Sequence, residues 1–338
     1  MTSIAPKYLI VGPSWIGDMV MAQSLFIDLK RRIPSCSIDV LAPRWTFPLL
    51  ERMPQVAQGV AMSLGHGQLG LIERFRLGVS LRPFCYDQAI VLPNSWKSAL
   101  VPLFARIPLR TGFLGEFRWG LLNDARRLDK MDIPMTVQRF VALGRDSQSR
   151  IPPKYPVPEL IVESANKARV LKKYSPTRSV NGVIGLCPGA EYGPAKRWPT
   201  DYFSSIAREK IEQGWSVWIF GSDKDKEIAR KIVASVPECE DFSGRTSLSD
   251  AIDLISLTDV IVTNDSGLMH VAAALSKNVL AIFGSSNPEA TPPLNPGAKI
   301  VSINIECAPC LKRTCEFGHY RCLRDITPER ILEELNRF

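Results

Sequence analysis

The sequence predicts an α/β protein built from two Rossmann-like, doubly wound domains. Short apolar runs that end in Gly, Pro, Ser, Asp or Asn alternate with helical patterns, and this alternation restarts near residue 181. The chain has 338 residues, which is long for one hydrophobic core and suits two domains. The region 145–180 is rich in Pro, Ser and charged residues. We therefore expect a boundary there, between domains at 1–165 and 166–338.

The first series opens with the apolar run KYLIVGP at 7–13, which predicts a buried strand. The stretch 14–32 repeats apolar residues at helical spacing, and Ser14 is the expected N-cap. Two further runs predict strands, SIDVLAP at 37–43 and YDQAIVLPN at 86–94. Strands separated by helices in this way indicate a parallel sheet.

The second series repeats the pattern. Its expected strands are 183–189, 215–222, 259–267 and 279–286. Its expected helices lie around 200–213, 223–235, 248–257 and 266–276. Thr200 and Thr327 are expected N-caps, and Pro328 opens a terminal helix within 326–338 that we expect to be able to pack back on the N-terminal domain. Ligands of such sheets bind beyond the carboxyl ends of the strands, so the loops there are candidate sites.

The composition is that of a globular protein with an excess of positive charge. The apolar fraction is 45%, the charged fraction 22%, the net charge +8 and the pI about 9.1. No apolar run is long enough for a transmembrane helix and the N-terminus lacks a signal-peptide pattern, so we expect a cytoplasmic protein. The charge favours polyanionic partners, and a basic solvated surface is the alternative. No motif for nucleic-acid binding is present, so no nucleic-acid partner is expected.

The eight cysteines fall into two groups. Cys36, Cys85, Cys187 and Cys239 are scattered and are expected to be packed. Cys307, Cys310, Cys315 and Cys322 form a C-x2-C-x4-C-x6-C cluster that includes His319. In a cytosolic chain this cluster indicates a structural metal before disulfides, although it lacks the paired C-x2-C motifs of a zinc ribbon. Reduced or redox-labile thiols are the favoured alternative to the metal.

Two loops at expected strand ends combine a tight turn with charge. In GPSWIGD at 12–18, Asp18 lies in the first turn of a helix, where the free N–H groups favour negative charge. Asp18 either interacts favourably with the helix dipole or serves as a carboxylate base.

In PGAEYGPAKRWP at 188–199, prolines stiffen a loop that holds Lys196 and Arg197 beside a helix start. This loop suits a diphosphate, and a surface turn with solvated cations is the alternative.

A third loop, TNDSGLMHVAAAL at 263–275, lets Asp265 or Ser266 cap a helix, and Gly267 permits close approach of a ligand. Ser266 and His270 have helical spacing and no orienting acid, which argues against a hydrolase pair. Phosphate binding by the helix N-terminus is favoured, and His270 is otherwise a core histidine.

A fourth loop, FGSDKDKE at 220–227, offers Asp223 or Asp225 to a ribose hydroxyl. The dinucleotide fingerprint Gly-x-Gly-x-x-Gly is missing, because GPSWIG at 12–17 lacks the middle glycine, and no Walker motif is present. The fourth loop alone therefore identifies no particular nucleotide.

Taken together, these motifs resemble glycosyltransferase family 9, the ADP-heptose:lipopolysaccharide heptosyltransferases. The resemblance spans nearly the whole chain and is closer to the enzymes that add the second heptose than to those that add the first. The motifs that carry it are GPSWIGDMVMAQSLF, LGHG at 64–67, LPNSWKSALVP at 92–102, GLLND at 120–124, CPGAEYGPAKRWP and VTNDSGLMHVAAAL.

The resemblance implies a GT-B fold, with two Rossmann-like domains facing a central cleft. It implies inverting transfer of a heptose from ADP-heptose to the first heptose of the lipopolysaccharide inner core. In that reaction Asp18 would be the base and Lys196 would contact the donor phosphates. The other donor-binding residues that it implies are Glu191, Tyr192, Asp223, Thr246, Asp265, Ser266, Gly267 and His270. No cofactor or catalytic metal is expected, because cations and helix termini supply the charge.

The implied acceptor is a phosphorylated, lipid-linked sugar, so basic residues are expected on the N-terminal half and peripheral association with the inner membrane is an option. Arg44, Lys97 and Arg118 are the candidates, and ordinary surface charge explains each of them equally well. Three other functions stay open. They are a dinucleotide-dependent oxidoreductase, a non-catalytic nucleotide- or nucleic-acid-binding module, and a family 9 relative with another donor or acceptor.

Overall fold

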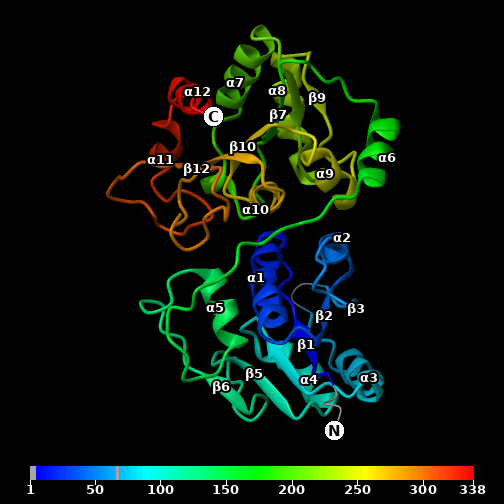
Figure 1. Cartoon of the computed structure of the whole chain (residues 1–338). Coiled ribbons are helices and arrows are strands. Elements are labelled where there is room, and N and C mark those ends of the chain that lie inside the picture. The colour runs from blue at the N-terminus through cyan, green and yellow to red at the C-terminus, as the bar shows by residue number, and fades with distance from the viewer. Residues whose placement is uncertain (1–4, 66–67) are drawn as a thin grey trace. The chain divides into compact units, whose positions relative to one another are not determined.

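The structure, a computed structural model, describes residues 5–65 and 68–338 (Figure 1). Residues 66 and 67 of the LGHG motif lie outside the described part. The chain divides into two compact units, unit 1 ending at Pro158 and unit 2 beginning at Glu159.

Unit 1 is a six-stranded parallel sheet with flanking helices. Its strands are β1 (Lys7–Val11), β2 (Ser37–Pro43), β3 (Gln58–Met62), β4 (Gln88–Val91), β5 (Leu109–Phe113) and β6 (Asp124–Arg126). Its α-helices are α1 (Ile16–Arg32), α2 (Phe47–Leu50), α3 (Leu71–Leu81), α4 (Leu100–Phe104) and α5 (Thr136–Leu143). Three 3-10 turns are η1 (Arg44–Thr46), η2 (Arg82–Phe84) and η3 (Trp96–Ala99). The strand order β3-β2-β1-β4-β5-β6 is that of a Rossmann sheet.

Unit 2 repeats this topology. Its strands are β7 (Val183–Cys187), β8 (Ser216–Ile219), β9 (Glu240–Asp241), β10 (Val260–Asn264), β11 (Asn278–Ile282) and β12 (Ala298–Val301). Its α-helices are α6 (Ser164–Tyr174), α7 (Thr200–Glu212), α8 (Lys226–Ser235), α9 (Leu248–Ile255), α10 (Gly267–Ala274), α11 (Arg321–Arg324) and α12 (Pro328–Leu335). Two 3-10 turns are η4 (Pro194–Lys196) and η5 (Asp223–Asp225). The order β12-β11-β10-β7-β8-β9 places the reversal of strand order between β7 and β10, as it lies between β1 and β4 in unit 1.

The division expected after residue 165 falls inside α6. This helix is joined to unit 2, because Arg169 and Lys173 form ion pairs with Asp250 of α9 at 2.6 and 2.8 Å. At the other end of unit 2, the buried face of α12 carries Ile331 into the same core that α7 and β11 line.

The central strands are buried on both faces, which explains why they read as continuous apolar runs. All five residues of β7 and of β10 are buried. Two of the expected N-caps, Ser14 and Thr200, are displaced by one residue. Trp15 rather than Ser14 precedes α1, and Pro199 rather than Thr200 precedes α7, whereas Thr327 is the N-cap of α12 as expected.

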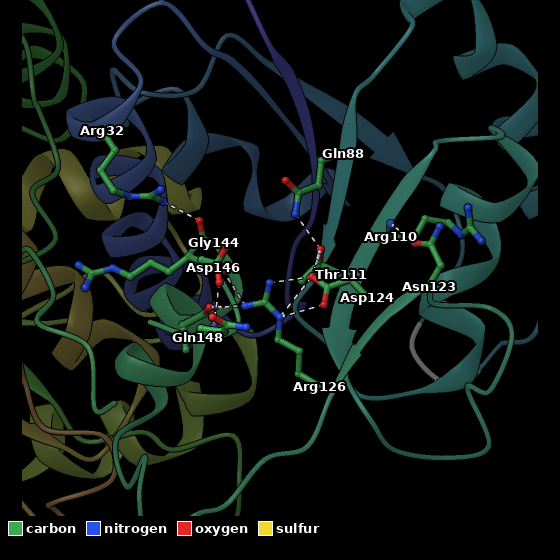
Figure 2. A network of polar contacts seen from close by, with 12 residues as sticks. Arg32, Gln88, Arg110, Thr111, Asn123, Asp124, Arg126, Gly144, Asp146 and Gln148 are labelled. Atoms are coloured by element: carbon green, nitrogen blue, oxygen red, sulfur yellow. Dashed lines mark hydrogen bonds and ion pairs between the residues drawn. The ribbon is translucent and has the colours of Figure 1, made fainter. Parts of the chain in front are cut away.

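A polar network fastens the edge of the unit 1 sheet (Figure 2). Asp124 of β6 accepts hydrogen bonds from Thr111 of β5 at 2.9 Å and from Arg126 at 2.6 Å. Arg126 also donates to the carbonyls of Ala142 and Arg145 at the end of α5. Burial alone would raise the pKa of Asp124, but the hydrogen bonds from Arg126 and Thr111 outweigh it and lower the pKa. Side-chain contacts therefore hold an edge strand that has only three residues.

Candidate functional site

A cavity of about 800 Å³ opens at the carboxyl ends of the central strands of unit 1. The turn 12–15 after β1 and the segment 92–98 after β4 line it together with Asp18. These strands flank the point where the strand order reverses, which is where doubly wound sheets bind ligands. Unit 1 thus has a candidate binding site at the carboxyl edge of its own sheet.

Asp18 lies in the first turn of α1, is half-buried and lines this cavity. The turn before it is closely packed, since the N–H of Gly12 donates to Leu41 O at 2.9 Å. A Cβ at Gly12 would lie 2.7 Å from the Met19 side chain, so a larger residue would displace this turn. The carboxylate therefore sits at the positive end of α1, in a fixed position, and reaches the cavity.

Four cationic side chains line the cavity: Arg74, Lys97, Lys130 and Arg139. Only Lys97 was expected from the sequence. The guanidinium of Arg74 donates to Leu69 O and Lys97 O, and burial lowers the pKa of both Arg74 and Arg139. Arg74 and Arg139 lie within helices α3 and α5, and Lys130 follows β6, a strand of three residues that the sequence did not predict. The predicted βα pattern therefore gave no signal for these three residues.

The other two residues expected at the acceptor do not line this cavity. Arg44 is exposed at the start of η1. Arg118 is fully buried, and its guanidinium donates to the carbonyls of Pro93 and Phe113. Burial lowers its pKa, and its Nε has no hydrogen-bond partner in the described part of the chain. The expectation that Arg118 contacts an acceptor is therefore corrected, since this side chain ties together the loops after β4 and β5.

In unit 2, the loop after β7 and the loop after β10 meet through an ion pair. Lys196 Nζ lies 2.5 Å from Asp265 Oδ2, and both side chains are largely buried. The same ammonium lies 5.0 Å from the centre of the Tyr192 ring. Ser266 occupies the N-cap position of α10 without a side-chain capping hydrogen bond, and Gly267 is the first residue of that helix. The expected donor residues of both loops are thus brought together at the start of α10.

Asn264, which the sequence interpretation passed over, fixes the two loops to each other. It is fully buried, donates from Nδ2 to Pro188 O at 2.7 Å, and accepts from the N–H of Trp198 at 3.0 Å. The Trp198 indole in turn donates to Ile326 O at 2.8 Å. The loop that carries Lys196 is therefore held at both ends.

His270 lies one turn into α10 and is buried. Burial is the main cause that lowers its pKa to about 4; the nearby Lys196 lowers it further, while Asp265 raises it. The imidazole is neutral at pH 7, so it can donate or accept a hydrogen bond but adds no positive charge.

The remaining expected donor residues follow β7, β8 and β9. Glu191 pairs with Lys224, and Thr246 donates to Phe242 O at 3.2 Å. Asp223 is highly exposed, and the hydrogen bond from Lys226 lowers its pKa. Asp225 is the other acid considered for binding a ribose hydroxyl. It is buried and accepts hydrogen bonds from Ser222, so it stabilises the turn instead.

The cysteines of the C-terminal cluster do not converge on a common point in the described part of the chain. Among residues 5–65 and 68–338, no three His, Cys, Asp or Glu side chains are arranged to hold a metal ion. The structure therefore does not bring Cys307, Cys310, Cys315 and Cys322 together as the structural metal site that the sequence suggested. Cys315 Sγ instead lies 4.0 Å from His319 Nδ1, and hydrogen bonds from the backbone N–H groups that follow it lower its pKa.

With two strand-end sites established, the comparisons decide the family. The profile of glycosyltransferase family 9 (heptosyltransferase) matches residues 74–321. The chain belongs to glycosyltransferase family 9. It is 47% identical to lipopolysaccharide heptosyltransferase 2 of Salmonella typhimurium, over 98% of this chain and 97% of the relative. It is 48% identical to lipooligosaccharide heptosyltransferase 2 of Haemophilus influenzae, over 97% of this chain and 98% of the relative.

A solved structure of the Escherichia coli ADP-heptose lipopolysaccharide heptosyltransferase II matches with a TM-score of 0.87 and 45% identity, covering 98% of both chains. The predicted family and fold class are therefore confirmed, and the chain is a family 9 glycosyltransferase. No helix in the described ranges is both long and apolar enough to cross a membrane.

Proposed function

We propose that this family 9 enzyme transfers L-glycero-D-manno-heptose from ADP-heptose to the first heptose of the lipopolysaccharide inner core, with inversion at the anomeric carbon. The proposal rests on the different charged groups that the two units hold. Unit 1 holds a carboxylate, Asp18, in a cavity, and unit 2 holds Lys196 and Asp265 at a helix start. The names of the relatives supply ADP-heptose as the donor and lipopolysaccharide as the acceptor class. The configuration of the heptose and its transfer to the first heptose follow from the family resemblance.

The donor diphosphate would bind where the loops after β7 and β10 meet. The free N–H groups of α10 at Ser266 and Gly267 and the ammonium of Lys196 favour an anion there. Tyr192 and His270 border the same ammonium. For the nucleoside, Glu191, Asp223 and Thr246 are the proposed contacts, since they follow the neighbouring strands.

The acceptor would enter the cavity of unit 1. Lys97 and Lys130 are the cations proposed to meet its phosphates, because the guanidinium of Arg74 already donates to carbonyls. Arg44 stays a proposal for the outer part of the acceptor. Asp18 would accept the proton of the attacking hydroxyl.

The reaction is a single displacement. The acceptor oxygen forms a bond to the anomeric carbon while the bond from that carbon to the ADP oxygen breaks, and the hydroxyl proton passes to Asp18. Lys196 and the start of α10 stabilise the charge that develops on the departing ADP. No metal is needed in this scheme, because protein cations and backbone N–H groups supply the positive charge.

We place the enzyme at the cytoplasmic face of the inner membrane. The chain carries a net charge of +8, and Trp15, Leu69 and Trp96 are exposed where they line the acceptor cavity. Apolar side chains beside cations suit an anionic lipid surface. Co-sedimentation with anionic vesicles but not with neutral vesicles is expected, and equal recovery with both would remove this assignment.

The test is a transfer assay with ADP-heptose and a core acceptor that bears one heptose. A mass gain of one heptose with release of ADP is expected. Asp18→Asn should lower the rate by about 10²- to 10⁴-fold while ADP still binds. Turnover of the donor with a different acceptor alone would instead indicate another family 9 reaction.

A further inference from the structure

The cysteine segment 307–322, which the proposed function does not use, packs directly on the donor loop. Ala195 N–H donates to Arg313 O at 3.0 Å, and the Tyr192 hydroxyl donates to Leu311 O at 2.6 Å. Leu311 N–H donates to Ser285 O at 2.7 Å. The segment is therefore hydrogen-bonded both to the loop that carries Lys196 and to the loop after β11.

Gly193 shows how close this packing is. Its φ is +152°, and a Cβ there would lie 2.5 Å from the backbone oxygen of Arg313. Only glycine lets the two backbones approach to this distance without strain. The position of Arg313 relative to the donor loop is thus fixed by backbone contacts, not by its own side chain.

The Tyr192 ring lies next to two cations. Lys196 Nζ is 5.0 Å from the ring centre, and the guanidinium carbon of Arg313 is 5.1 Å from it. The two charges are therefore about 10 Å apart at most. In the described part of the chain no carboxylate lies within ion-pair distance of Arg313, whereas Lys196 pairs with Asp265.

We propose that Arg313 is a second cation of the donor diphosphate site, placed there by the cysteine segment. The inference rests on the proposed function, since it assumes that Lys196 contacts the donor phosphates. Asp265 already balances the charge of Lys196, so a diphosphate leaving group needs a further cation. Arg313 is exposed, unpaired with any described acid, and within about one Debye length of Lys196. Its planar guanidinium suits two phosphate oxygens at once.

The neighbouring Lys312 provides a matched control. It is exposed on the same segment and carries the same charge, but its ammonium lies 2.9 Å from Glu316. Lys312→Gln removes one positive charge from the segment and leaves the guanidinium of Arg313 in place over the Tyr192 ring. Any effect of lost net charge alone should therefore be equal in Lys312→Gln and Arg313→Gln.

The experiment measures the affinity of the full-length protein for ADP and for adenosine by calorimetry. Arg313→Gln should weaken ADP binding about tenfold or more and leave adenosine binding unchanged. Arg313→Lys should recover part of the loss, and Lys312→Gln should match the wild type. ADP binding by the wild type should also weaken with salt more steeply than that of Arg313→Gln.

Three results would overturn the proposal, and each has its own meaning. Equal ADP affinity in Arg313→Gln and wild type removes Arg313 from the site and leaves the proposed function intact. An equal loss of ADP and adenosine affinity means that the side chain supports the loop rather than the phosphates. If the wild type binds ADP no more tightly than adenosine, the diphosphate adds no affinity. That result also contradicts the proposed phosphate contact of Lys196 and the proposed donor.

Discussion

Replacing Asn264 by alanine should destabilise unit 2 by about 3 kcal/mol. The side chain is fully buried and serves two backbone groups, Pro188 O and the Trp198 N–H. Alanine leaves both groups buried without a partner, and each such group costs about 1–3 kcal/mol. The free energy of unfolding should therefore fall by a few kcal/mol, because the loop that carries Lys196 loses both hydrogen bonds.

Urea denaturation of Asn264→Ala and wild type, followed by fluorescence, measures this difference. Asn181→Ala is the matched control. Asn181 donates to Gln213 O at 3.1 Å but is exposed, so water replaces the lost bond and the change should stay within about 0.5 kcal/mol. If Asn264→Ala is as stable as the control, the two hydrogen bonds do not hold the loop and the reasoning is refuted.

Three other predictions concern the site of unit 2. Lys196→Ala should lower the transfer rate by about 10²-fold, measured as product per time at saturating acceptor; an unchanged rate would mean that the ammonium does not meet the leaving group. A chelator should leave the transfer rate unchanged, because protein groups supply the positive charge; loss of activity that added divalent metal restores would contradict this. Because the folded pKa of His270 is about 4 and the unfolded value about 6.5, the unfolded chain binds more protons between these values and stability falls as pH drops through this window. Wild type should therefore lose about 2 kcal/mol more than His270→Gln between pH 7 and pH 5 in denaturation curves, and parallel losses would show that the imidazole is not buried in its neutral form.

The sequence predicted the central strands and missed the outer ones, for a physical reason. A strand covered on both faces, such as β7 or β10, is a continuous apolar run and is easily recognised. Strands toward the sheet edges have weaker patterns, as in β3 with its half-buried residues or β9 with only two residues. Their pairing depends on neighbours that are distant in the sequence.

The positions of two candidate site residues could be predicted, because each of these charged residues closely follows a recognisable strand. Asp18 and Lys196 follow the first strand of each sheet, so the βα pattern alone led to them. Arg118 could not be distinguished from a surface cation, because burial depends on the loops that enclose it. Asn264 was missed because its hydrogen bonds join segments 76 and 66 residues apart in the chain.

The brevity of two edge strands also affects how the protein behaves in concentrated solution. At about 3.3 Å per residue, the three residues of β6 extend about 10 Å and the two of β9 about 7 Å. A foreign strand needs a longer row of unpaired N–H and carbonyl groups to add stably to a sheet. Each six-stranded sheet therefore has one edge strand that is too short to pair stably with a strand of another chain. Such pairing is a route by which partly folded chains aggregate.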